Sequence, residues 1–203
     1  MDVLRKAEEL LESEIPTIVD YPAPQSRGGL HDYYSEGIYW HPDKTAVNGY
    51  PYVRRDGVVN RKSFTSHKKI LEELKRNTSV LYKAYSETHD VRYARKIEEN
   101  LYRFFVNEDT RMNPNMKYAE AVPGLFEGRS IGIMDSLKLI EIPSMVMRLN
   151  DEGVLSDGLR AGVAAWFSEY ASWLDGLEDL DRNPSSCCGS SYFLQISVFS
   201  GID

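Results

Sequence analysis

The sequence has little cysteine, no long apolar run and no excess of basic side chains. Its two cysteines, Cys187 and Cys188, are neighbours in the chain, and neighbouring cysteines rarely close a disulfide, so a disulfide-stapled fold is excluded. A helix that crosses a bilayer needs about 20 consecutive apolar residues, and no segment has them, so we expect no membrane partner. Because the formal net charge is −7, no basic surplus can neutralise phosphates, which argues against nucleic-acid binding.

The beginning of the chain also lacks the apolar core of a signal peptide. The stretch MDVLRKAEELLESE is charged and amphipathic, so export of this chain is not expected from its own sequence. A dinucleotide-binding fold is disfavoured, because GRSIG lacks the required glycine spacing and a preceding strand. What is present is a globular composition, 42% hydrophobic and 27% charged over 203 residues, which fits one ordinary domain.

Apolar residues at helical spacing recur along most of the chain, and they predict an all-α protein in which strands are minor. Pro16 is expected to end the first helix, and Asp90 is placed to cap a later one. The first three expected helices are the first dozen residues, a segment opening at Ser66 and one after Asp90. A fourth runs from near Ile131 to about Leu149 and is interrupted at Pro143, a fifth starts at Asp157, and a last one begins in YFLQISVF. The fifth carries an aromatic stripe that is expected to belong to the core: Trp166, Phe167, Tyr170 and Trp173.

Two long irregular segments separate these helices, from His31 to Ser63 and from Asn107 to Arg129. Loops of such length are uncommon in compact domains and are usually functional or disordered. The first contains HDYYSEGIYWHPDKTAVNGYPYVRRDG, and its many aromatic rings argue against disorder. We expect the two segments to lie on the same side of the helices.

The first segment combines aromatic rings with arginines, which suits a groove for an acidic sugar chain, since rings stack on sugars and guanidinium groups bind carboxylates. The alternative is that the rings form the small core that a long ordered loop needs. His31 and His41 are candidate acid-base residues, or else structural hydrogen-bonding groups. A metal site of these histidines with Asp32 and Asp43 matches no strong ligand pattern.

The second segment carries polar side chains able to bind hydroxyls or carboxylates, although Asn and Pro at this spacing also make a turn. These side chains are Asn113, Asn115, Lys117 and Tyr118. The basic pairs of the chain are interpreted as solvated charge, except for Arg54 beside the aromatic stretch. The pairs are Arg54 with Arg55, Arg61 with Lys62, and Lys68 with Lys69.

Four stretches, in one order, resemble the alginate lyase family of polysaccharide lyases. HDYYSEGIYWHPD resembles H-D-Y-x-S-x-x-x-Y-W-W-P-D, with His41 in place of the second tryptophan, and GYPYVRRDGVVN resembles G-x-P-Y-x-R-R-D-G-x-x-N. DTRMNPNMKYAEAVPGLFEGRSIGIMD resembles T-R-M-N-P-N-x-x-Y-x-Q-x-x-P-G-x-x-x-G-R-x-x-G-I-x-D, with Glu120 where glutamine is usual. WFSEYASWL resembles W-F-x-x-Y-x-x-W-L, and the similarity runs from about residue 3 to the end.

The resemblance implies an α/α toroid, an incomplete α/α barrel of helical hairpins, over residues 1–203, with a lid-like loop at about 22–63 above a cleft. It implies β-elimination on acidic polysaccharides such as alginate or glucuronan, with no metal or other cofactor, in a family whose members are typically periplasmic or secreted. The positions expected to bind substrate are His31, Tyr34, Tyr39, Trp40, Arg54, Asn115, Tyr118 and Arg129.

The catalytic Asn-His pair of the family has no clear counterpart. Anchored on Gly189, Tyr192 and Gln195, its positions fall on Cys187 and Cys188. Anchored on Asn183, the histidine falls on Ser185, and the later catalytic arginine and tyrosine have no equivalent. The resemblance therefore implies either a lyase or an inactive, sugar-binding or truncated relative.

The family architecture needs about twice the helices expected here. We therefore predict an open helical edge with bare apolar faces on Trp166–Leu174 and YFLQISVF, and possible self-association through that edge.

Overall fold

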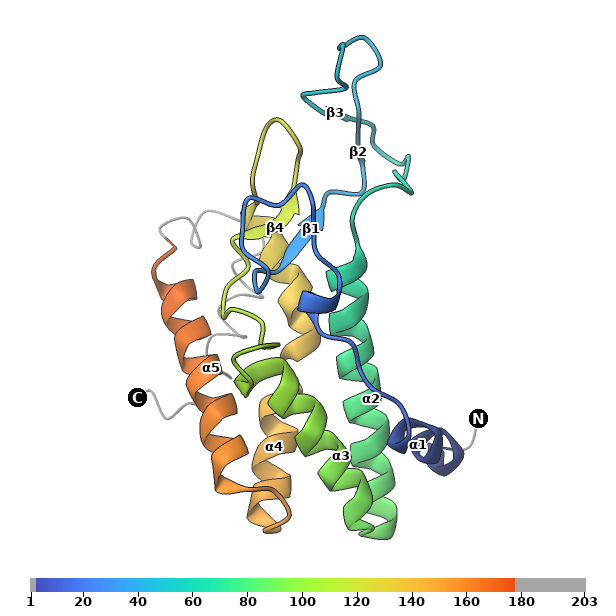
Figure 1. The fold of residues 1–203 in the computed structure, drawn as a ribbon, viewed down its shortest axis with the longest axis vertical. Coiled ribbons are helices and arrows are strands. Elements are labelled where there is room, and N and C mark those ends of the chain that lie inside the picture. The colour runs from blue at the N-terminus through green and yellow to red at the C-terminus, as the bar shows by residue number, and fades with distance from the viewer. Residues whose placement is uncertain (1–2, 178–203) are drawn as a thin grey trace.

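Helices dominate the fold in the computed structural model, which describes residues 3–177. Figure 1 shows the four longer helices side by side, with the loops and short strands gathered at one end and the N-terminal helix near the other. The expected helix-rich class is confirmed. The α-helices are α1 (Val3–Leu11), α2 (Ser66–Thr88), α3 (Val91–Leu101), α4 (Ile142–Asp151) and α5 (Asp157–Asp175).

Short helical turns of other kinds connect these elements. A 3₁₀ turn spans Ile18–Asp20, and a π-helical turn, Tyr102–Val106, continues α3. A 3₁₀ segment, Ser130–Leu139, leads from the second long loop toward α4. The sequence pattern predicted a helix beginning near Ile131, but it did not distinguish this tighter winding from an α-helix.

Local capping explains where several helices begin and end. The Asp90 carboxylate accepts the Arg92 backbone N–H at 2.9 Å and starts α3, which confirms the expected cap. The Ser156 hydroxyl accepts the Leu159 N–H at 3.2 Å and starts α5 in the same way. His89 ends α2 in a left-handed conformation with φ of 55°, and its N–H bonds the carbonyl of Tyr85.

Of two expectations about proline, the first is wrong and the second is confirmed. The first helix ends at Leu11, before Pro16, where Ser13 donates both its N–H and its hydroxyl to the carbonyl of Leu10. The helical run after Ile131 is interrupted beside Pro143, as expected, because the 3₁₀ segment ends at Leu139 and α4 begins at Ile142 with Pro143 in its first turn. A proline is tolerated there, since the first N–H groups of a helix have no partner within it.

The aromatic stripe of α5 lies in the core, as its spacing predicts. Trp166 and Tyr170 are at most 2% exposed, and their rings stack at 5.4 Å. The Trp166 indole donates to the carbonyl of Met112 at 2.6 Å, which ties the second long loop to the helix. The expected bare apolar face on Trp166–Leu174 is therefore wrong, and YFLQISVF lies outside the described residues.

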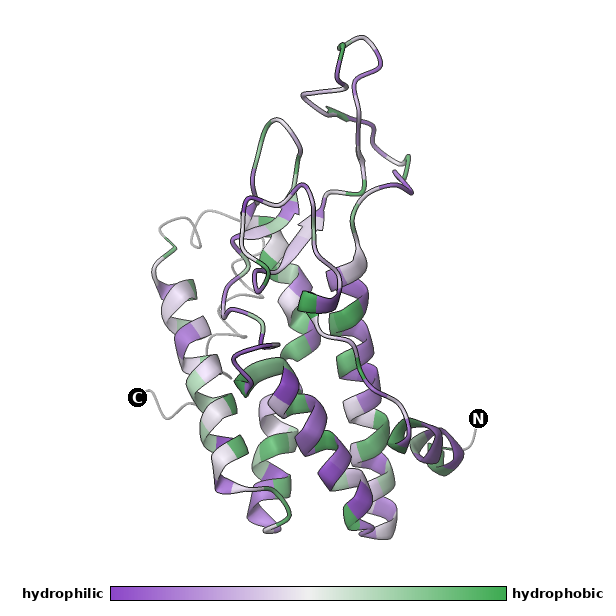
Figure 2. Ribbon diagram, in the orientation of Figure 1, coloured by the Kyte–Doolittle hydropathy of each residue, from purple (hydrophilic) through white to green (hydrophobic). Residues whose placement is uncertain are grey.

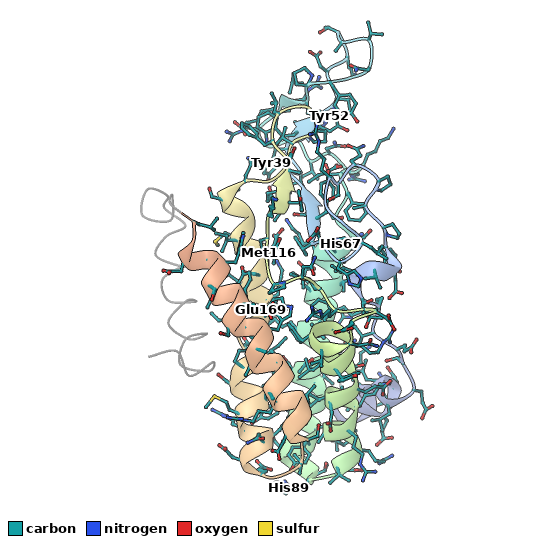
Figure 3. The ribbon with its side chains drawn as sticks, turned by 60° about the vertical axis from the view of Figure 1, so that its left-hand side comes forward. Tyr39, Tyr52, His67, His89, Met116 and Glu169 are labelled. Carbon is teal, nitrogen blue, oxygen red and sulfur yellow. The ribbon has the colours of Figure 1, made fainter. Side chains whose placement is uncertain are left out.

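Two small sheets organise the irregular segments. Strand β1 (Tyr34–Glu36) pairs in parallel with β4 (Tyr118–Ala121), which joins the first long loop to the second. Strand β2 (Trp40–His41) pairs antiparallel with β3 (Val53–Arg54) in the segment that projects from the body (Figure 1). Both loops thus lie at one end of the helices, as expected. Figure 3 shows Tyr39 and Tyr52 at this loop end and His89 at the opposite end.

The hydropathy of the residues shows how the helices pack. Figure 2 shows hydrophobic and hydrophilic stretches alternating along the helices, as amphipathic helices require to pack a common core. Within residues 3–177, no helix combines the length and apolar character needed to cross a membrane.

Candidate functional site

A cavity of about 530 Å³ is lined by residues of the β2–β3 pair, of β4 and of the beginnings of α2 and the 3₁₀ segment. Its wall combines aromatic, apolar and charged side chains from these elements. The lining residues are Gly37, Ile38, Tyr39, Trp40, Arg54, Lys68, Glu120, Arg129, Ile131, Met134 and Asp135.

The β2–β3 pair positions the rim of the cavity. Trp40 and Arg54 are register partners across the two strands, so the strand pairing places the two residues next to each other. The side chain of Asn60 donates to the Trp40 carbonyl at 2.8 Å and steadies this strand from the other side. The Arg54 side chain is 64% exposed and pairs with Asp56 at 2.7 Å, so it remains accessible from solvent.

Four charged side chains form the floor of the cavity. Lys68, in the first turn of α2, lies 2.9 Å from a Glu120 oxygen and 3.1 Å from an Asp135 oxygen. Arg129 lies 2.9 Å from the second Glu120 oxygen, and its guanidinium carbon is 5.8 Å from the centre of the Trp40 ring. We call Lys68, Glu120, Arg129 and Asp135 the charged floor. The two positive and two negative charges of the floor sum to zero.

Hydrogen bonds from the loop hold Asp135 in the floor. The Tyr33 hydroxyl and the Ser35 hydroxyl donate to the same Asp135 oxygen at 3.0 and 2.9 Å. Gly132 permits this approach, because a Cβ there would lie 2.4 Å from the Cβ of Ala119 in β4. A larger residue would push the 3₁₀ segment, and Asp135 with it, away from the strand.

Protonation states in and beside the floor follow from burial and from these contacts. Burial lowers the pKa of Lys68, but the hydrogen bond to Glu120 and the charges of Glu120 and Asp135 outweigh it and raise that pKa above its usual value. Burial, reinforced by Asp135, raises the pKa of Tyr33. Lys68 is therefore a cation and Tyr33 a neutral donor at physiological pH, and neither is poised to act as a base.

The interpretation of Lys68 as solvated charge is wrong, because its ammonium group is bound by two carboxylates in the cavity. The sequence placed Lys68 in a basic pair that resembles the other surface pairs. Its partners lie 52 and 67 residues further along the chain, which local patterning does not reveal. The one available signal was the pair of acidic positions in the third family-like stretch, Glu120 and Asp135.

Four of the expected substrate-binding residues line this cavity: Tyr39, Trp40, Arg54 and Arg129. Tyr34 instead lines a second cavity of about 220 Å³ with Gln25, Arg27 and residues 121 and 123–127. Its ring is buried, its hydroxyl donates to Glu36 at 3.1 Å, and burial followed by the Glu36 charge raises its pKa.

The remaining three expected residues are not among those that line either cavity. A ring nitrogen of His31 lies 2.7 Å from the carbonyl of Arg111 and links the two loops. Asn115 accepts the N–H of Lys117 at 3.1 Å, in the manner of a turn. Tyr118 is the register partner of Tyr34 in the β1–β4 pair.

The aromatic rings of the first long loop divide into a buried and an exposed group. Tyr33 and Tyr34 are buried and form the loop's own core together with His67 and Phe64. Tyr39 and Tyr50 are exposed, and Tyr50 stacks on Tyr52 at 5.5 Å. His41 bonds the carbonyl of Val58 at 2.9 Å.

The expected catalytic positions, Cys187 and Cys188, lie outside the described residues. Within residues 3–177, no three His, Cys, Asp or Glu side chains are arranged to hold a metal ion.

Two comparisons with known proteins point to the same family. The sequence model of the alginate lyase family matches residues 17–186. Among solved structures, the chain is similar to an alginate lyase from Bacteroides ovatus, with 25% sequence identity and a TM-score of 0.88. The match covers 98% of this chain and 54% of that one, so the chain spans about half the length of the solved relative. The comparison with curated proteins gave no match.

Proposed function

Because the chain belongs to the alginate lyase family, we propose that it supplies the saccharide-binding cleft of a polysaccharide lyase acting on uronate polymers such as alginate or glucuronan. One observation carries the proposal: a single cavity brings together the Trp40 ring, the exposed guanidinium group of Arg54 and the charged floor. Rings and guanidinium groups are the physical match for a pyranose that bears a carboxylate.

The proposal includes the architecture of the family. The helices α2 and α3 are joined at His89 and Asp90, and α4 and α5 at residues 152–156, so each pair is a helical hairpin. Such hairpins are the units of an α/α toroid, and the loop end would then face the centre of its cleft. The segment at about 22–63 would cover the bound polymer as a lid.

The chemistry of such a lyase is a β-elimination. A base removes the proton from C5 of the uronate, the electron pair forms a C4–C5 double bond, and the C4–O bond of the glycosidic linkage breaks. The leaving oxygen then takes a proton from an acid, and a cation beside the substrate carboxylate stabilises the charge that develops on it. Arg54 is suited to that last role, because its present partner Asp56 is itself 71% exposed and can give way to a ligand.

The described part of the cavity offers binding groups rather than a base. Lys68 is protonated, and the carboxylates of Glu120 and Asp135 already bond to cations and hydroxyls. A second candidate function follows from this: a non-catalytic relative that binds the polymer without cleaving it. In a catalytic protein, the base would come from outside the charged floor.

Incubation with alginate and with glucuronan separates the two candidates. A catalytic protein produces unsaturated uronate, whose new double bond raises the ultraviolet absorbance, and a non-catalytic one shows binding by calorimetry without this rise. The absence of both binding and product would contradict the proposed function in either form.

A further inference from the structure

Glu120 holds both cations of the charged floor at once. One of its carboxylate oxygens lies 2.9 Å from the Lys68 ammonium nitrogen, and the other lies 2.9 Å from a terminal nitrogen of Arg129. A carboxylate oxygen of Asp135 also lies 3.1 Å from the Lys68 ammonium nitrogen. The positive side chains at the bottom of the cavity are thus neutralised by the protein itself.

The position of this carboxylate is fixed from several sides. Glu120 is in a left-handed backbone conformation, with φ of 53°, where a non-glycine residue needs support from its surroundings. That support comes from Ser35, whose hydroxyl accepts the Glu120 N–H at 2.9 Å, and from Arg129, which donates to the Glu120 carbonyl at 2.7 Å. The Glu120 side chain is only 17% exposed, so it cannot move into solvent without losing both cations.

A uronate carboxylate that enters this part of the cavity meets a like charge already in place. Lys68 and Arg129 each already donate to the Glu120 carboxylate, so an incoming carboxylate competes with Glu120 for the same two cations, and burial strengthens the repulsion between the two anions. A sugar hydroxyl meets the opposite situation, because it can donate to a carboxylate of the floor.

We infer that Glu120 is a specificity-determining residue, which makes the floor a subsite for a saccharide unit without a free carboxylate. The inference rests on the proposed function, because it takes the cavity to bind a polysaccharide. It narrows the substrate to a polymer in which uronate units, bound at the rim near Arg54, are accompanied by neutral or carboxyl-esterified units at the floor.

The test compares two ligands that differ only in charge: a uronate oligosaccharide, and the same oligosaccharide with its carboxyl groups reduced to hydroxymethyl groups. Because reduction also removes the carboxylate that Arg54 would bind at the rim, the comparison is made between protein variants, each titrated with both ligands by calorimetry. In Glu120→Gln, which keeps the size of the side chain, affinity for the uronate should rise roughly tenfold while affinity for the reduced ligand changes little.

Two further variants complete the design. Glu141→Gln removes a carboxylate paired with Lys75 at 3.1 Å, away from this cavity, and should leave both affinities unchanged. Glu120→Asn replaces Glu120→Gln if the latter melts early, since asparagine tolerates the left-handed backbone. Binding of the uronate by the wild type with no gain in Glu120→Gln would overturn the inference and leave the proposed function standing. Binding of neither ligand by any variant would overturn both.

Discussion

The cavity contains two arginine–carboxylate pairs with nearly equal distances and very different surroundings. At the rim, Arg54 lies 2.7 Å from Asp56, and the two side chains are 64% and 71% exposed. At the floor, Arg129 lies 2.9 Å from Glu120, and the two side chains are 27% and 17% exposed. The floor pair is also linked to Lys68 and, through it, to Asp135.

This difference separates a binding group from a structural one. An exposed ion pair contributes about 0–1 kcal/mol to stability, so the rim can exchange its carboxylate for one on a ligand at little cost. A buried pair costs about 3–5 kcal/mol when one partner is removed, because the other charge is left without compensation. Contact distance alone does not distinguish the two roles, whereas burial and the number of partners do.

The largest expected effect follows from removing the central cation of the floor. Lys68→Met leaves Glu120 with one cation and Asp135 with none, so the free energy of unfolding should fall by roughly 2–3 kcal/mol, less than for a fully buried pair. Urea denaturation measures it. The matched control is Lys69→Met, an exposed neighbour that should change stability by no more than about 0.5 kcal/mol. Equal effects of the two substitutions would contradict the distinction between floor and surface.

A smaller loss of stability is expected from a substitution at Gly37, which lies between Trp40 of the rim and Arg129 of the floor. In Gly37→Ala, the new Cβ would lie 2.7 Å from an Arg129 nitrogen and 2.8 Å from the Trp40 ring, so both side chains must shift. Overpacking of this kind should cost about 1–2 kcal/mol, seen as a lower melting temperature. Gly158→Ala is the control, since a Cβ there meets nothing within 4 Å and the backbone is helical. Equal melting temperatures for the two variants would show that the contact at Gly37 is not a constraint.

A still smaller effect is expected on how stability depends on pH, through the buried side chain of His67. His67 accepts the Tyr34 N–H at 3.0 Å and lies 2.9 Å from the Tyr21 carbonyl, and burial lowers its pKa below 6.5. Because the unfolded chain then binds this proton more tightly, the free energy of unfolding should fall as the pH drops below 6.5. His67→Gln should make denaturation midpoints less sensitive to pH between about 5 and 7. An unchanged pH profile in that variant would contradict this role.

The sequence predicted the helices well because their signals are local. Asp90 as a cap, Ser66 and Asp157 as starting points, and the buried stripe at Trp166 follow from residues within a few turns of one another. Pro143 marks a break correctly because a proline that is unfavourable in a helix interior is favoured in a first turn, so α4 begins beside it.

The site was predictable only in part, because its floor depends on distant contacts. Trp40 and Arg54 are close in sequence and were expected to lie together. The role of Lys68 depends on carboxylates delivered by β4 and by the 3₁₀ segment, after the chain has passed through α2 and α3. Tyr33 and Tyr39 are six positions apart in one aromatic stretch but differ in burial: Tyr33 is fully buried and bonds Asp135, which is distant in sequence, whereas Tyr39 is 41% exposed.

The comparison between rim and floor is tested most directly by Arg54→Met, with Arg55→Met as the neighbouring control. Stability and affinity for a uronate oligosaccharide are measured in the same samples, by urea denaturation and by calorimetry. Arg54→Met should change the free energy of unfolding by no more than about 0.5 kcal/mol and should weaken uronate binding roughly tenfold, while Arg55→Met changes neither. A variant of Arg54 that loses stability instead, or that binds the uronate as well as the wild type, would contradict the assignment of the rim arginine to ligand binding.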